Sequence, residues 1–73
     1  MIHRTALVDP TAHFGHDVSV GPYAIVGPRV TLGDGCTLAA HAVLERNVKL
    51  GAGAKIGYGT VIGTDPQDTK YQG

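Results

Sequence analysis

The chain reads VGPYAI at residues 20–25, VGPRVT at residues 26–31 and LGDGCT at residues 32–37. Each segment begins with a large aliphatic residue, continues with glycine and has a small or modest apolar residue at its fifth position. The three segments follow one another without a gap. They therefore define a unit of six residues that can be tested outward in both directions.

The six-residue period holds along almost the whole chain. All eleven first positions carry a large apolar side chain, and they are Ile2, Val8, Phe14, Val20, Val26, Leu32, Leu38, Leu44, Leu50, Ile56 and Ile62. A period this strict indicates a repeat architecture, in which each unit packs on its neighbours.

Glycine and proline occupy fixed places in the unit. Seven of the eleven glycines stand at the second position and three stand at the fourth, while Pro10, Pro22 and Pro28 all stand at the third. The fourth position also holds Asp17, His41, Asn47 and Asp65, residue types that tolerate a left-handed backbone. The second to fourth positions therefore predict a tight corner.

The pattern fits a strand and excludes a helix. Six residues turn about 600° in an α-helix at roughly 100° per residue, which would spread the apolar positions around the helical surface. In a strand, the fifth position and the next first position face the same side. Three such sides close a triangle of 18 residues, so the sequence predicts a parallel β-helix of about four coils.

Length, composition and charge restrict the function. The chain has 73 residues, six basic and six acidic side chains and one cysteine, Cys36. This argues for a single domain without an internal disulfide and against a nucleic-acid-binding protein, which needs clustered cations. No apolar run approaches the roughly 20 residues of a transmembrane helix, and residues 1–4 lack the apolar core of a secretory signal. We therefore expect a cytoplasmic protein.

The six-residue unit resembles the hexapeptide motif of left-handed β-helix transferases, and the resemblance covers residues 2–64. It implies a left-handed coil, which the general preference for right-handed crossovers does not predict. We accordingly expect a hexapeptide β-helix over residues 1–64. Residues 65–73 leave the repeat, because Asp68 stands where the next aliphatic residue belongs. They are expected to form a divergent loop.

The segment Pro-Gln-Asp-x-Lys-Tyr-x-Gly at residues 66–73, together with the opening residues 2–12, resembles the UDP-N-acetylglucosamine O-acyltransferase family that begins lipid A synthesis. Thr69 departs from the leucine usual in that family. The resemblance implies that Asp68 and Lys70 contact the sugar nucleotide, with Gln67 close by. It places the general-base histidine, the remaining coils and a helical domain beyond Gly73. It also implies acyl carrier protein thioester as donor, trimers with active sites between subunits, and no cofactor.

The four histidines of the chain are expected to be solvated corner or outward residues. His3, His13, His16 and His41 occupy four different positions of the unit, and no two are 18 residues apart, so a metal site within one chain is not expected. A metal site shared between chains, as in the carbonic anhydrase class of hexapeptide proteins, stays open. Cys36 occupies an inward position, which favours a buried and unreactive thiol.

Two hypotheses of different classes follow. In the first, the chain is the N-terminal part of the acyltransferase and is inactive alone. In the second, it is a short structural β-helix that assembles with copies of itself, because the unpaired strand edges at both ends favour end-to-end association or trimers. Another hexapeptide enzyme, such as an acetyltransferase, is a further alternative.

Overall fold

The computed structural model describes residues 1–63, and these form a β-helix without α-helices. Every strand consists of the sixth residue of one unit and the first residue of the next. The strands are β1 (Leu7–Val8), β2 (His13–Phe14), β3 (Ser19–Val20), β4 (Ile25–Val26), β5 (Thr31–Leu32), β6 (Thr37–Leu38), β7 (Val43–Leu44), β8 (Lys49–Leu50), β9 (Lys55–Ile56) and β10 (Val61–Ile62).

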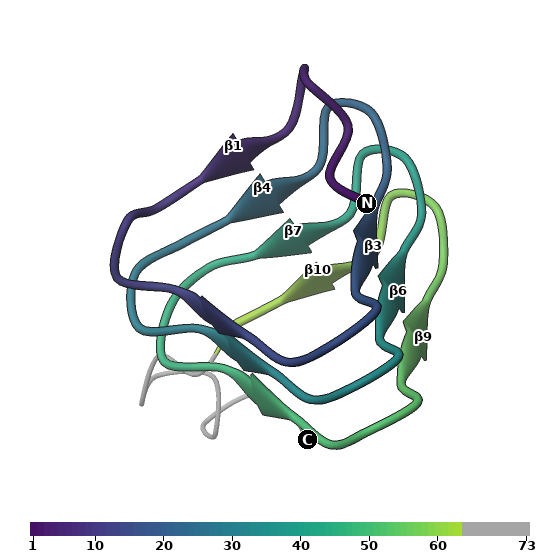
Figure 1. Ribbon diagram of the computed structural model, residues 1–73. Helices are drawn as coiled ribbons and strands as arrows, with labels where there is room; N and C mark the ends of the chain where they lie inside the picture. The colour runs from purple at the N-terminus through teal and green to yellow at the C-terminus, as the bar shows by residue number, and fades with distance from the viewer. Residues whose placement is uncertain (64–73) are drawn as a thin grey trace, which may run out of the picture.

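The strands form three parallel sheets, which are the three sides of a triangular prism (Figure 1). One sheet has the order β1-β4-β7-β10, the second β2-β5-β8 and the third β3-β6-β9. Each residue pairs with the residue 18 positions later, as in Leu7 with Ile25, and a bridge from Ile2 to Val20 extends the third sheet. The predicted parallel β-helix with an 18-residue coil is confirmed.

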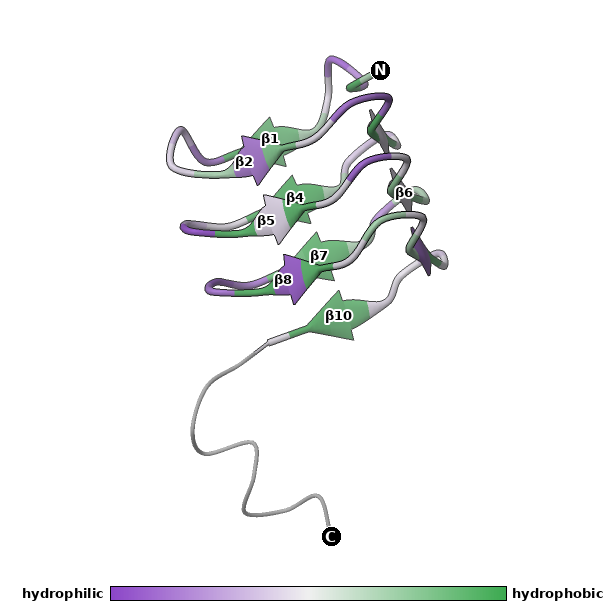
Figure 2. Cartoon of the chain, turned by 60° about the horizontal axis from the view of Figure 1, so that its bottom comes forward, coloured by the Kyte–Doolittle hydropathy of each residue, from purple (hydrophilic) through white to green (hydrophobic). Residues whose placement is uncertain are grey.

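The coil is left-handed. In Figure 2 the chain runs from β4 at the back, around the left side to β5 at the front and on to β6 at the right, while successive coils descend. Strands β1 to β9 complete three coils and β10 begins the next. The ten strands of the described residues, at three per coil, amount to slightly more than three turns, fewer than the four predicted.

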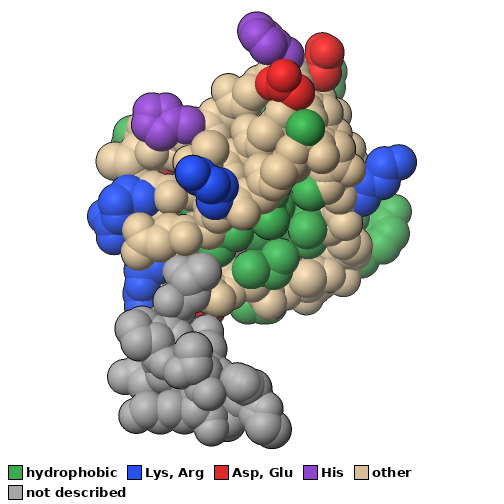
Figure 3. Space-filling view, turned by 90° about the horizontal axis from the view of Figure 1, so that it is seen from below, with side chains coloured by type: hydrophobic (Ala, Val, Ile, Leu, Met, Phe, Trp, Pro, Cys, Tyr) green, Lys and Arg blue, Asp and Glu red, His purple; other side chains and the backbone are tan. Residues whose placement is uncertain are grey.

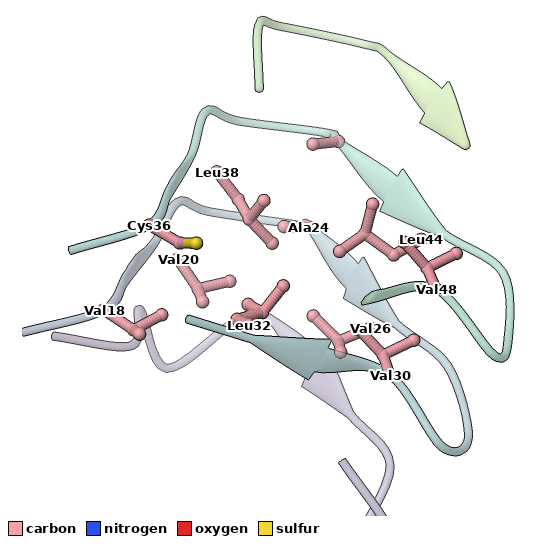
Figure 4. Packing of buried hydrophobic residues seen from close by; sticks show 11 residues of the cluster. Val18, Val20, Ala24, Val26, Val30, Leu32, Cys36, Leu38, Leu44 and Val48 are labelled. Atoms are coloured by element: carbon pink, nitrogen blue, oxygen red, sulfur yellow. The ribbon is translucent and has the colours of Figure 1, made fainter. Parts of the chain in front are cut away.

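The core is a stack of side chains inside the prism (Figure 4). All eleven buried hydrophobic residues of the described chain occupy first or fifth positions: Val18, Val20, Ala24, Val26, Val30, Leu32, Cys36, Leu38, Ala42, Leu44 and Val48. Burial decreases toward the N-terminal end, where Ile2 is 45% exposed and Val8 36% exposed. This follows from the architecture, because an inward side chain is covered only by the coils above and below it.

The corners use a left-handed backbone at the fourth position, as predicted. From residue 17 to residue 59 every fourth position has positive φ, including Asp17, His41 and Asn47. Tyr23 and Arg29 also adopt this conformation, with φ of 59° and 57°, although bulky residues rarely do. The repeat overrides their own preference, because the chain must turn at the same place in every coil.

The described residues contain no helix that is long and apolar enough to cross a membrane.

Candidate functional site

The residues expected to bind the sugar nucleotide, Gln67, Asp68 and Lys70, lie outside the described residues. Asp65, predicted to be a corner residue, also lies there. Their contacts thus remain predictions. The described part of the chain shows the scaffold that leads to them: β10 ends at Ile62, on the sheet that also contains β1, β4 and β7.

All four histidines are exposed and lie at corners or on the outer surface, as expected. His3 Nδ1 lies 2.9 Å from Thr5 Oγ1 within one corner. The His41 ring stacks on Tyr23, with ring centroids 5.4 Å apart and planes 14° from parallel. The His16 backbone N–H donates to Asp34 Oδ1 at 2.7 Å. Within residues 1–63, no imidazole lies in a pocket.

A ladder of polar contacts joins three coils at the corner before the β2-β5-β8 sheet. In the first coil, Asp9 Oδ1 accepts hydrogen bonds from the Thr11 backbone N–H at 2.8 Å and from the Thr11 hydroxyl at 2.7 Å. Thr11 Oγ1 in turn accepts from the Arg29 backbone N–H at 2.8 Å. Arg29 Nε donates to Asn47 Oδ1 at 2.7 Å in the third coil.

This ladder lowers the pKa of Asp9 below its ordinary value. The hydrogen bonds from the backbone and the side chain of Thr11 stabilise the carboxylate, and the positive charge of Arg29 adds to them. Asp9 is therefore ionised at neutral pH. Because the Asp9 carboxylate already accepts two hydrogen bonds from Thr11 within the corner, we interpret the ladder as structural rather than catalytic.

A second ladder has the same plan at the corner before the β1-β4-β7-β10 sheet. Thr5 Oγ1 accepts from the Tyr23 backbone N–H at 2.9 Å, and the Tyr23 ring stacks on His41 one coil later. Tyr23 lies in this corner, and its ring covers the His41 ring of the next coil. Tyr58 at the equivalent corner of a later coil is 83% exposed.

Cys36 is buried, as predicted, with no exposed surface. Its Sγ lies 3.2 Å from the Gly51 carbonyl oxygen, which accepts its weak S–H hydrogen bond. A thiol in this position has no access to a substrate. Cys36 therefore acts as a small core residue.

The described residues form neither a pocket nor a cluster of three or more His, Cys, Asp or Glu side chains able to hold a metal ion. Figure 3 shows basic side chains at the left and at the right edge of the molecule, and hydrophobic side chains exposed in the middle of the view. Arg29, Arg46, Lys49 and Lys55 are all exposed on the outer surface.

One surface feature was missed in the sequence. The outward residues of the β1-β4-β7-β10 sheet are all aliphatic, and they are Leu7, Ile25, Val43 and Val61. Their spacing of 18 residues was visible in the sequence. The spacing indicates a shared face only when the residues of one sheet are considered apart from those of the other two, because neighbouring units in the chain belong to different sheets.

The pattern described as "Bacterial transferase hexapeptide (six repeats)" matches residues 11–46 and 29–64. The chain belongs to the hexapeptide transferase family. This match covers most of the described β-helix and agrees with its six-residue unit and its parallel sheets. No curated protein sequence matches the chain.

Two solved structures of this architecture resemble the chain. LpxA from Acinetobacter baumannii is 42% identical over 74% of this chain, with a TM-score of 0.73. The Arabidopsis UDP-N-acetylglucosamine acyltransferase is 41% identical over 84% of this chain, with a TM-score of 0.82. The chain spans about a fifth of the length of each of these two proteins, since the match covers 21% of each one.

Proposed function

We propose that this chain is part of an enzyme that transfers an acyl group from acyl carrier protein to the 3-hydroxyl of UDP-N-acetylglucosamine, the first step of lipid A synthesis. The observation that carries this proposal is the 41% identity to the Arabidopsis UDP-N-acetylglucosamine acyltransferase over 84% of the chain. The similarity to Acinetobacter LpxA supports it. The proposed location is the cytoplasm.

The proposed reaction moves an acyl group from the thioester sulfur of acyl carrier protein to the 3-hydroxyl oxygen of the sugar. A general base takes the proton of the sugar 3-hydroxyl while its oxygen attacks the thioester carbonyl carbon. The carbon–sulfur bond then breaks, the carrier protein leaves as a thiol and the sugar keeps the acyl group as an ester. The base is the histidine that the family resemblance places beyond Gly73.

Asp68, Lys70 and Gln67 have binding roles in this proposal. The carboxylate of Asp68 accepts hydrogen bonds from sugar hydroxyls, and the ammonium of Lys70 donates to carbonyl or phosphate oxygens. Gln67 lies next to them in the divergent loop proposed for residues 65–73. The β-helix of residues 1–64 serves as the rigid support from which this loop departs.

The histidines of the described residues support the proposal that the chain alone is inactive. All four are exposed, and the two that contact other side chains do so at corners. A proton acceptor in open solvent is poorly placed for catalysis, because it neither holds the substrate nor excludes water.

Self-association is the second part of the proposal. We expect trimers, with active sites between subunits, as the family resemblance implies. A purely structural unit that assembles through its surfaces is the second candidate function. The outward aliphatic residues of the β1-β4-β7-β10 sheet favour assembly in either case.

To test this function, the corresponding segment of the Acinetobacter enzyme is replaced by this chain, which gives a hybrid enzyme. Acyl transfer from acyl carrier protein thioester to UDP-N-acetylglucosamine is followed by mass spectrometry. We expect the hybrid enzyme to be active and Asp68→Ala in it to lower kcat/KM at least tenfold, whereas Asp17→Ala, in a corner of the first coil, has little effect. A folded hybrid without activity, or equal effects of the two substitutions, would contradict the proposal.

The 73-residue chain alone is tested in the same assay. We expect no acylated sugar, because the general base lies outside the chain in this proposal. Acyl transfer by the isolated chain above the uncatalysed rate would show that one of its own residues acts as the base.

A further inference from the structure

The first two corners of the chain are built on one plan. His3 and Asp9 stand at the second position of their units, and Thr5 and Thr11 stand two residues later at the fourth. Each second-position residue makes the same backbone contacts: its N–H donates to the next coil at 2.8 Å, and its carbonyl oxygen accepts from the fifth-position N–H at 3.0 Å. The side chains that complete the two corners can therefore be compared directly.

In the second corner the acceptor is a carboxylate oxygen. Asp9 Oδ1 accepts from the Thr11 backbone N–H at 2.8 Å and from the Thr11 hydroxyl at 2.7 Å. Thr11 Oγ1 then accepts from the Arg29 backbone N–H at 2.8 Å, which joins this corner to the next coil. The carboxylate thus fixes the hydroxyl in the orientation that leaves a lone pair for Arg29.

In the first corner an imidazole nitrogen takes the place of that oxygen. His3 Nδ1 accepts from the Thr5 backbone N–H at 3.2 Å and lies 2.9 Å from the Thr5 hydroxyl. Thr5 Oγ1 accepts from the Tyr23 backbone N–H at 2.9 Å. A backbone N–H can only donate, so Nδ1 must present its lone pair to it. The His3 ring is therefore a neutral imidazole with its hydrogen on Nε2.

We propose that His3 is a pH-sensitive switch of the first corner, which the neutral imidazole closes and its protonation opens. A protonated ring has a hydrogen on both nitrogens, so Nδ1 would place a donor against the Thr5 backbone N–H at 3.2 Å. The ring must then turn away, and the Thr5 hydroxyl loses its fixed orientation toward Tyr23. Histidine side chains ordinarily change charge between about pH 5 and 8, which sets the range of the switch. The inference is independent of the proposed acyl transfer.

The surroundings of the first corner offer nothing that stabilises a protonated ring. No Asp or Glu of residues 1–63 belongs to this corner, to the corresponding corners of the following coils or to the flanking strands β1, β3 and β4. The cations nearby are Arg4 and the N-terminal ammonium group, and the other titratable groups are Tyr23, His41 and Tyr58 in the following corners. Protonation of His3 therefore brings no new attraction that offsets the lost acceptor.

The first corner holds the segment that covers the interior of the second coil. Figure 1 shows this segment running from the N-terminus beside β3 into β1. The bridge from Ile2 to Val20 and a hydrogen bond of 2.9 Å from the Leu7 N–H to the Ala24 carbonyl oxygen fix it there. Val20 is 3% exposed and Ala24 has no exposed surface. Opening of the switch therefore loosens the part of the chain that keeps these two side chains from water.

The tautomer is tested by nuclear magnetic resonance on the nitrogen-15-labelled 73-residue chain. Long-range proton–nitrogen correlations distinguish the ring nitrogen that carries a hydrogen from the one that does not. At pH 7.5 we expect the bare nitrogen of His3 to be Nδ1. A His3 ring with its hydrogen on Nδ1 at this pH would overturn the inference.

The switch is tested by hydrogen exchange at the Tyr23 and Arg29 amides, which report on the first and the second corner. The protection factor corrects for the intrinsic pH dependence of exchange. From pH 7.5 to pH 5, we expect it to fall at least about threefold at Tyr23 and to stay constant at Arg29. The second corner does not respond because the hydrogen bonds from Thr11 hold the pKa of Asp9 below its ordinary value. Equal changes at both amides would contradict a switch located at His3.

His3→Asn is the matched variant, because its Oδ1 accepts a hydrogen bond as Nδ1 does and does not become protonated in this range. We expect the Tyr23 protection factor of this variant to be the same at both pH values. A fall as large as in wild type would assign the pH dependence to His41, which stacks on Tyr23, and would overturn the inference. His3→Asp, which copies the second corner, serves in the same comparison if His3→Asn fails to fold.

Discussion

At the scale of single residues, the second position of the unit is restricted by the approach of the next coil. A Cβ atom added to Gly27 would lie 1.7 Å from the Glu45 carbonyl oxygen, far inside contact distance. At Gly57, the same position in a later coil, a Cβ atom would lie 3.7 Å from Thr60 Oγ1, which is an ordinary contact. The requirement for glycine therefore arises from the neighbouring backbone.

We predict that Gly27→Ala lowers the free energy of unfolding by about 2–3 kcal/mol, because either the two coils must separate or the backbone must distort. Gly57→Ala is the matched control, and its effect should stay within about 0.5 kcal/mol. Urea unfolding followed by circular dichroism measures both. Equal losses for the two variants would show that something other than the close approach to Glu45 is responsible.

At the scale of the elements, the first two corners of the chain, at residues 3–6 and 9–12, differ from the other corners of residues 1–63. From Gly35 onward, the backbone N–H at the fourth position donates to a third-position carbonyl of the preceding coil, as from His41 to Pro22 at 3.0 Å. Tyr23 and Arg29 donate instead to the hydroxyls of Thr5 and Thr11. These threonines lack the left-handed backbone of the later corners, so their side chains supply the acceptor.

We predict that Thr11→Val lowers the free energy of unfolding by about 1 kcal/mol, because the Arg29 N–H loses its acceptor and Asp9 loses a donor. Thr11→Ser keeps the hydroxyl and should lose clearly less. Thermal unfolding of the two variants provides the comparison. If serine and valine are equally destabilising, the methyl group of Thr11 matters and its hydroxyl does not.

At the scale of the whole molecule, stability is a sum over neighbouring coils, because the prism has no contacts between distant coils. Ile2, Val20, Leu38 and Ile56 lie in line along one side of the interior. Leu38 is 1% exposed, whereas Ile2 at the end of the same line is 45% exposed. Equivalent positions of the repeat thus contribute unequally.

We predict that Leu38→Ala costs about 2–5 kcal/mol, enough to unfold a chain of this size, because the central coils cannot close the cavity. Ile2→Ala should cost less than about 1.5 kcal/mol, since much of its side chain is already in water. Chemical unfolding of both variants measures the difference. Similar costs at the two positions would contradict a stability that depends on neighbouring coils.

Much of the architecture could be predicted from the sequence because every unit of the repeat shows the same pattern of inward, outward and corner residues. The inward first and fifth positions, the corners and the 18-residue coil all follow from the six-residue period, and Cys36 was placed in the core on that ground alone. The candidate site was predictable only through the family resemblance of residues 66–73. A binding loop does not repeat, so its residues are not constrained by a period.

The sequence by itself determined the strand-and-corner unit, because the alternation of inward and outward side chains and the glycine positions are local properties of the chain. The tertiary structure alone decided which outward residues share a face and which glycine approaches the next coil. It also decided that the Thr11 hydroxyl accepts a hydrogen bond from the Arg29 backbone N–H. Each of these depends on residues 18 or 19 positions apart, brought together only when the coil closes.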